Sequence, residues 1–117
     1  MSQSSYSEAA EYLGEAFLKI SKAMGNVTRL GLLCTMLDKS ESSHKDLMFN
    51  SYAGPINPAS LRHHIKVLRE ADLVEKGSYK LTRLGERLTQ PLRKRDGSIK
   101  SVQDYLNALS LEEEFES

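Results

Sequence analysis

The side chains with the clearest capacity for chemistry are basic and imidazole groups gathered between residues 58 and 71. They are Arg62, His63, His64, Lys66 and Arg69. An arginine can pair with a guanine edge through two hydrogen bonds, and lysine or arginine can neutralise phosphates. These residue types therefore indicate an anionic partner, and nucleic acid uses both kinds of contact. The competing interpretation is that the charges only solvate a helix surface.

Metal chemistry and catalysis find little support in the sequence. Adjacent helix residues point about 100° apart, so His63 and His64 cannot chelate one ion as residues spaced by three or four can. Cys34 is the one cysteine, which excludes an internal disulfide and a cysteine-based metal cluster, and its apolar stripe predicts a core position. No phosphate loop or nucleophile–base pair is present. We therefore expect no enzyme activity, no metal and no cofactor.

The charge distribution along the chain is uneven although the formal net charge is zero. Residues 58–100 carry eleven basic and five acidic side chains, whereas residues 101–117 carry five acidic and no basic ones. Attraction to phosphate depends on the local field rather than on the total charge of the chain. A basic middle section between neutral and acidic ends is therefore compatible with nucleic-acid binding.

Length and hydropathy favour one compact domain over residues 1–117. Hydrophobic residues make up 39% of the 117 positions and charged residues 27%, which is typical of a globular fold. No apolar run approaches the roughly 18 residues of a membrane span, and the first residues lack the basic flank and apolar core of a signal peptide. With a single cysteine, these features lead us to expect a cytoplasmic protein.

Apolar residues at helical spacing predict four helices in the first two thirds of the chain. They cover residues 7–24, 28–38, 44–49 and 58–71. Ser7 is the expected N-cap of the first helix. Asn57 and Pro58 mark the start of the fourth, because asparagine is a preferred N-cap and proline is favoured at the first helical position.

Two strand-like runs, 73–76 and 79–82, follow the cationic helix. Gly77-Ser78 joins them at the spacing of a two-residue hairpin turn. A further helix from Arg83 to about Gln90 is expected to be interrupted or ended by Pro91. This order predicts a mainly α fold with a small β-hairpin wing, which is a winged helix-turn-helix with extra N- and C-terminal helices.

Three segments carry a direct resemblance to a family. Residues 25–33 read GNVTRLGLL, residues 60–74 read SLRHHIKVLREADLV, and residues 79–85 read YKLTRLG. They are similar to the patterns G-N-x-T-R-L-x-I-L, T-V-S-x-H-L-K-V-L-R-E-A-G-L-V and Y-x-L-T-x-x-G of ArsR-like winged-helix transcriptional regulators of archaea and bacteria. The resemblance covers about residues 20–90. It departs from the family in an enlarged turn over residues 50–57 and in the lack of a cysteine pair, so thiolate metal sensing is not supported.

The resemblance implies that the helix over residues 58–71 enters the major groove of double-stranded DNA. Ser60, Arg62 and His63 are then the candidates for base edges. Asn57 either caps the helix or reaches a phosphate, and His64 matches a recurrent family histidine between the core and the DNA backbone. The candidates for phosphate contact, including two at the hairpin, are Lys45, Lys66, Arg69, Lys76 and Lys80.

The terminal helices over residues 7–24 and 98–110 are expected to form a homodimer, with an acidic tail at 111–117. Their apolar seams lack partners within so small a core, and pairing across a two-fold axis would place two recognition helices one DNA turn apart. The alternative is that both helices pack on their own domain. The alternative function is a winged-helix module for protein contact in a transcription or chromatin complex. No residue pattern identifies a small-molecule effector.

Overall fold

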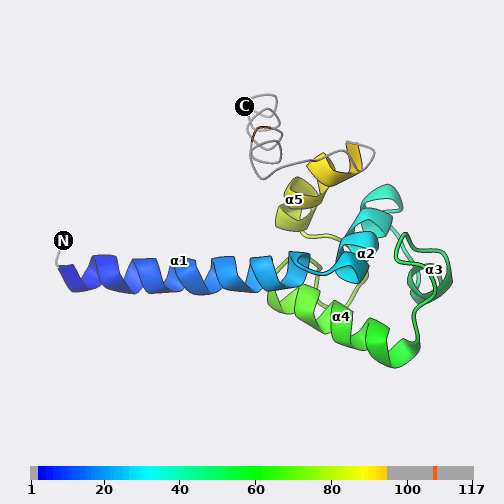
Figure 1. Cartoon of the computed structure of the whole chain (residues 1–117), viewed down its shortest axis with the longest axis horizontal. Helices are drawn as coiled ribbons and strands as arrows, with labels where there is room; N and C mark the ends of the chain where they lie inside the picture. Colours follow the sequence, from blue (N-terminus) through cyan, green and yellow to red (C-terminus); the bar gives the residue numbers. More distant parts are fainter. Residues whose placement is uncertain (1–2, 95–106, 108–117) are drawn as a thin grey trace.

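The computed structural model describes residues 3–94 and residue 107. This part of the chain holds five helices (Figure 1): α1 (Gln3–Met24), α2 (Val27–Asp38), α3 (His44–Phe49), α4 (Pro58–Glu70) and α5 (Arg83–Lys94). The predicted helix over residues 98–110 and the acidic tail lie outside the described residues, apart from Asn107.

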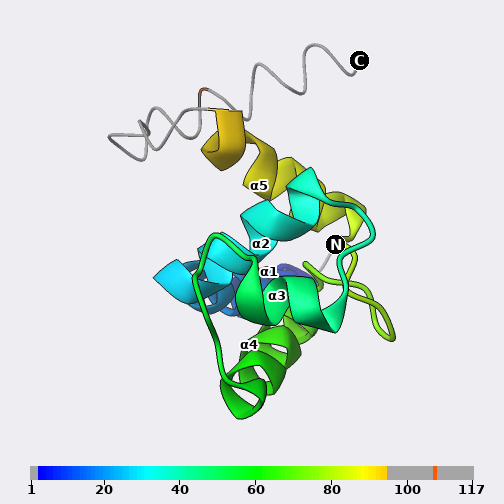
Figure 2. The same ribbon diagram turned by 90° about the vertical axis from the view of Figure 1, so that its right-hand side faces the viewer.

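The core lies where α2, α3, α4 and α5 meet (Figure 2). Each helix brings apolar side chains at a spacing of three or four residues, so one stripe of each helix faces inward. Burying one leucine side chain contributes about 1.5–3 kcal/mol, which makes these stripes the main source of stability. The fully buried members include Leu32, Leu33, Leu47, Leu61 and Leu68, and Leu73 from the segment after α4 joins them.

Helix α1 extends away from the other helices along most of its length (Figure 1). Its C-terminal end packs on α2 and α4, where Ala23 is fully buried. Phe17 and Leu18 are 68% and 67% exposed. The helix begins at Gln3, so the prediction that Ser7 caps it was wrong: Ser7 lies inside the helix.

Side-chain caps define the starts of the next three helices, and the sequence predicts the cap of α4. The Asn26 side chain accepts a hydrogen bond from the Arg29 N–H and caps α2. The helix therefore begins at Val27, one residue earlier than the expected start at residue 28. Ser43 forms a capping box with Asp46 at the start of α3. The Asn57 side chain accepts from the Ser60 N–H at 2.9 Å, with Pro58 in the first helical position, which confirms the predicted start of α4.

The predicted β-hairpin wing was wrong. Among the described residues no strand is formed, and the runs 73–76 and 79–82 share one isolated antiparallel bridge between Val74 and Leu81. The two runs are joined by two backbone hydrogen bonds, from the Glu75 N–H to the Lys80 carbonyl at 2.8 Å and from the Thr82 N–H to the Leu73 carbonyl at 3.0 Å, which is too short a ladder for a strand. The fold class is therefore all-helical, with residues 72–82 forming an ordered turn between α4 and α5.

Arg69 fastens the turn to α4. Its Nε donates to the Glu75 carbonyl at 3.0 Å and its Nη2 donates to the Ser78 carbonyl at 2.7 Å. The guanidinium carbon also lies 5.7 Å from the centre of the Tyr79 ring, within the range of a cation–π contact. Two carbonyls of the turn are thus bound to a side chain of α4.

A second correction concerns the end of α5. The helix continues through Pro91 to Lys94, whereas the sequence predicted that Pro91 would interrupt or end it near Gln90. Pro91 is fully buried, so its packing offsets the backbone hydrogen bond that a proline cannot donate.

The enlarged turn over residues 50–57 is fastened to α2 and α3. The Tyr52 N–H donates to the Thr35 hydroxyl at 2.9 Å, and the Ile56 N–H donates to the Met48 carbonyl at 2.9 Å. Gly31 permits this approach, because a Cβ there would lie 2.7 Å from the Ala53 nitrogen. The extra residues therefore form a fixed surface feature.

Helix α4 ends in a Schellman motif with aspartate in the left-handed position. The Leu73 N–H donates to the Leu68 carbonyl and the Asp72 N–H donates to the Arg69 carbonyl, both at 3.0 Å, and Asp72 has a φ of 60°. Glycine adopts this conformation without the steric cost that a Cβ imposes. The ArsR-like pattern that residues 60–74 resemble has glycine at the position of Asp72.

We expect Asp72→Gly to raise the free energy of unfolding by about 0.5–1 kcal/mol, because it removes the left-handed strain at the end of α4. Chemical denaturation would measure the change. Asp72→Ala is the control, since alanine keeps the Cβ and should bring no gain. A loss of stability in Asp72→Gly would contradict this account.

Candidate nucleic-acid interface

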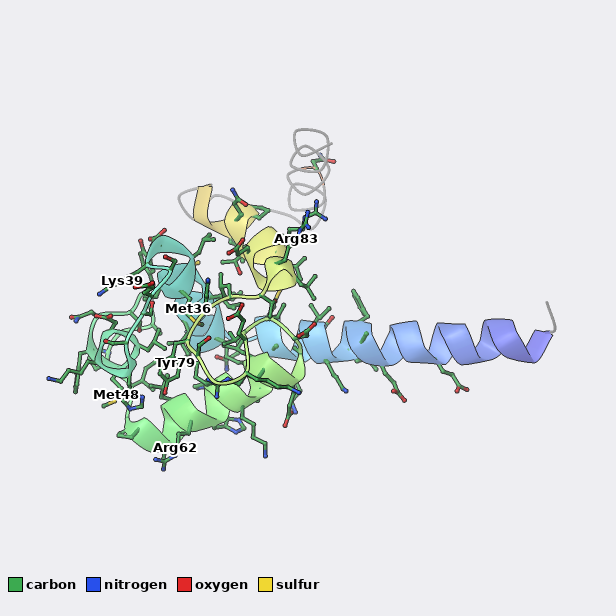
Figure 3. The ribbon with its side chains drawn as sticks, turned by 180° about the vertical axis from the view of Figure 1, so that it is seen from behind. Met36, Lys39, Met48, Arg62, Tyr79 and Arg83 are labelled. Carbon is green, nitrogen blue, oxygen red and sulfur yellow. The ribbon has the colours of Figure 1, made fainter. Side chains whose placement is uncertain are left out.

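The outward face of α4 is cationic. One residue turns a helix by about 100°, so Arg62, His63 and Lys66 share the side opposite Leu61 and Leu68. The first three are exposed and the two leucines are buried. Figure 3 shows Arg62 projecting from α4 away from the other helices. This face meets the geometric requirement for a helix that enters a groove.

The N-terminus of α4 holds Asn57 and Ser60. The Asn57 oxygen accepts from the Ser60 N–H, so its capping role is confirmed, while a phosphate contact by Asn57 stays a prediction. The Ser60 side chain is half-buried, beside the outward face. The first turn of α4 therefore offers fewer free polar groups than its middle.

A cleft of about 510 Å³ lies between α4 and the turn over residues 72–82. Its basic lining consists of Arg62, Lys66, Arg69 and Lys76, with one acid, Glu70. The hydroxyl of Tyr79 and Nδ1 of His44 lie 3.0 Å apart at the α3 side of the cleft. The structure thus brings together four of the predicted basic contacts across a single opening.

The remaining predicted contacts are placed differently. Lys45 on α3 and Lys80 on the turn are exposed and do not line the cleft. Arg69 does line it, but its guanidinium is bound to two carbonyls of the turn. It holds the turn against α4, and a phosphate contact by Arg69 stays a prediction.

Arg29 is the residue that the sequence interpretation missed. It is 8% exposed, and its Nε and Nη2 donate to the Ala23 and Lys22 carbonyls at 2.8 and 2.9 Å. Its Nη1 lies 3.1 Å from Nδ1 of His64 on α4. A signal was present: Arg29 falls on the buried stripe of α2, three residues before Leu32.

His64 has an altered titration as a result of this environment. Partial burial lowers the pKa of its imidazole, and the positive charges of Arg29 and His63 lower it further. The neutral ring is therefore favoured in the folded protein. His63 is exposed, its ring 5.6 Å from that of His64, so the two histidines have different surroundings.

Comparison with known proteins adds no relative: no family model, curated protein or solved structure matches this chain. Within residues 3–94 and 107, no group of three or more histidine, cysteine or acidic side chains is arranged to hold a metal ion. None of the helices in this part of the chain is long and apolar enough to cross a membrane.

Proposed function

We propose that this protein binds double-stranded DNA through the outward face of α4 and regulates transcription in the cytoplasm. The observation that carries the proposal is this face: Arg62, His63 and Lys66 are exposed together on a helix whose opposite side is anchored in the core. A major groove admits an α-helix and displays a distinct donor and acceptor pattern for each base pair. Membership of the ArsR-like regulators is part of the proposal and rests on the resemblance of three segments.

The assignment of roles follows from position on α4. Arg62 and His63, with Ser60 beside them, face the base edges. Lys66 lies further along the helix and binds a phosphate, as does Lys76 across the cleft. Lys45 and Lys80 are exposed on neighbouring elements and extend the contact with the backbone. Specificity then depends on few side chains, whereas affinity depends on many charges.

The test is a fluorescence-anisotropy titration of the full chain against random duplex DNA at about 50 and 200 mM salt. If the protein neutralises roughly six to ten phosphates per dimer, affinity should fall about 10³- to 10⁵-fold between these conditions. Absence of binding at the lower salt concentration would refute the proposal.

The same protein is proposed to act as a homodimer joined through α1. Phe17 and Leu18 are exposed side by side on a helix that otherwise contacts the domain only at its C-terminal end. Pairing two such helices would bury these side chains and present two copies of α4 to the DNA.

We expect Phe17→Glu to convert the dimer to a monomer in sedimentation-velocity experiments. A two-fold interface loses the contact twice, and a buried carboxylate adds a desolvation cost, so dimerisation should weaken at least about 100-fold. Val27→Glu is the matched control, because Val27 is 84% exposed at the start of α2 rather than on α1. Equal effects of the two substitutions would contradict an α1 interface.

A second candidate function, protein contact within a transcription complex, is favoured by Phe49 and Tyr52. These side chains are 60% and 66% exposed beside the enlarged turn over residues 50–57. Binding of a protein partner through this surface would persist at salt concentrations that abolish DNA binding.

A further inference from the structure

We propose that Arg29 is a positioning residue that holds His64 in the neutral tautomer protonated on Nε2, so that His64 donates an uncharged hydrogen bond to a DNA backbone phosphate. This inference rests on the proposed function. It adds His64 as a phosphate contact of α4 and Arg29 as the residue that orients the His64 ring.

The tautomer follows from the donor properties of arginine. A guanidinium group carries only donors, so the Nδ1 atom 3.1 Å from Arg29 Nη1 must accept the hydrogen bond. In a neutral imidazole, an accepting Nδ1 leaves the proton on Nε2. Partial burial and the nearby charges of Arg29 and His63 lower the pKa of the ring and favour this neutral form.

The Arg29 guanidinium is fixed in place, so it can determine the tautomer of His64. Two of its three nitrogens are bound to the Ala23 and Lys22 carbonyls at the end of α1, and its side chain is almost fully buried. The third nitrogen is directed across to α4. One side chain of α2 therefore ties the end of α1 to a ring on α4.

The position of His64 suits a backbone contact. It lies on the flank of α4 between the buried stripe of Leu61 and Leu68 and the outward face of His63, and it is partly exposed. The cleft that Arg62 and Lys76 line is on the opposite flank. A helix in the major groove has a phosphate backbone on each side, so groups on both flanks meet phosphates.

This contact differs from a lysine contact in its salt dependence. A neutral donor releases no counterion when it binds phosphate, whereas each neutralised phosphate contributes about −0.9 to the slope of log affinity against log salt. His64 should therefore add affinity without adding to that slope.

Two amide substitutions distinguish the roles of the two ring nitrogens of His64. His64→Asn keeps a polar atom near the Nδ1 position and lacks one at Nε2, while His64→Gln places an amide near Nε2. We expect His64→Asn to lower the affinity for random duplex DNA about tenfold with an unchanged salt slope, and His64→Gln to restore most of it. Lys66→Ala is the comparison, since it should reduce the slope by about one.

Nitrogen-detected NMR of the full chain tests the tautomer without DNA. The long-range correlations of His64 should show a protonated Nε2 and an unprotonated Nδ1 in the wild type. Arg29→Met should give a mixture of tautomers, and the His64 variants carry the test if Arg29→Met does not fold.

The outcomes are distinct from those of the proposed function. Wild type that fails to bind duplex DNA would refute the function, whatever the tautomer. If the wild type binds DNA, this inference would be overturned by a His64→Asn variant that binds equally well or that has a smaller slope of log affinity against log salt. A protonated Nδ1 in the wild type would overturn it too.

Discussion

Gly85→Ala should destabilise the protein by about 3 kcal/mol or more. A Cβ at Gly85 would overlap the Leu73 carbonyl oxygen, far inside van der Waals contact. The obstacle is backbone that is itself bound, because the Thr82 N–H donates to the same Leu73 oxygen at 3.0 Å. Overpacking of this kind typically costs about 1–3 kcal/mol, and more when no flexible side chain can yield.

Chemical denaturation of three glycine variants would check this result. Gly14 is the matched control, because nothing lies within 4 Å of a Cβ added there and the site is an exposed helix position. Gly14→Ala should be neutral or stabilising by up to about 1 kcal/mol. Gly31→Ala should be destabilising, since its Cβ would meet the Ala53 backbone at 2.7 Å. Similar stabilities for Gly85→Ala and Gly14→Ala would contradict the packing described.

The second large effect concerns DNA. Arg62→Ala combined with Lys66→Ala should weaken binding to random duplex DNA about 100-fold or more. The two substitutions remove adjacent charges from the outward face of α4, and the loss of the Lys66 phosphate contact should lower the salt slope by about one per protomer. Neither side chain packs in the core, so the melting temperature should change little.

Lys19→Ala combined with Arg83→Ala is the control for this experiment. It removes the same formal charge from exposed positions of α1 and α5, and Arg83 lies across the molecule from Arg62 (Figure 3). We expect this pair to lose only a few-fold in affinity. Equal losses in the two double variants would indicate that overall charge, and not α4, governs binding.

The starts of α3 and α4 were predictable from the sequence because their causes are local. Asn57 and Pro58 fix the start of α4, and the extent of α3 is as expected. The side-chain oxygen of a cap reaches a backbone N–H only two or three residues away, so the residues involved are visible in one short window. Pro91 did not end α5 as predicted, because its burial offsets the backbone hydrogen bond that proline cannot donate.

The turn and the site depended on contacts between distant residues. Strand-like runs at 73–76 and 79–82 predicted a hairpin, but they share two backbone hydrogen bonds and no strand forms. Arg69 holds the turn between them against α4. Likewise, the pairing of Arg29 with His64 spans 35 positions. Periodicity identified the cationic face of α4 correctly as exposed, and it could not show which of its basic side chains already have partners.

The projection of α1 has a consequence for its local unfolding. An isolated helix shorter than about 12–15 residues is marginal in water, because nucleation is costly and few residues share that cost. The N-terminal turns of α1 lack neighbours in the described domain, so their amide protons should exchange with solvent much faster than those near Ala23. Association of two chains would slow that exchange, and the order of this segment would then vary with protein concentration.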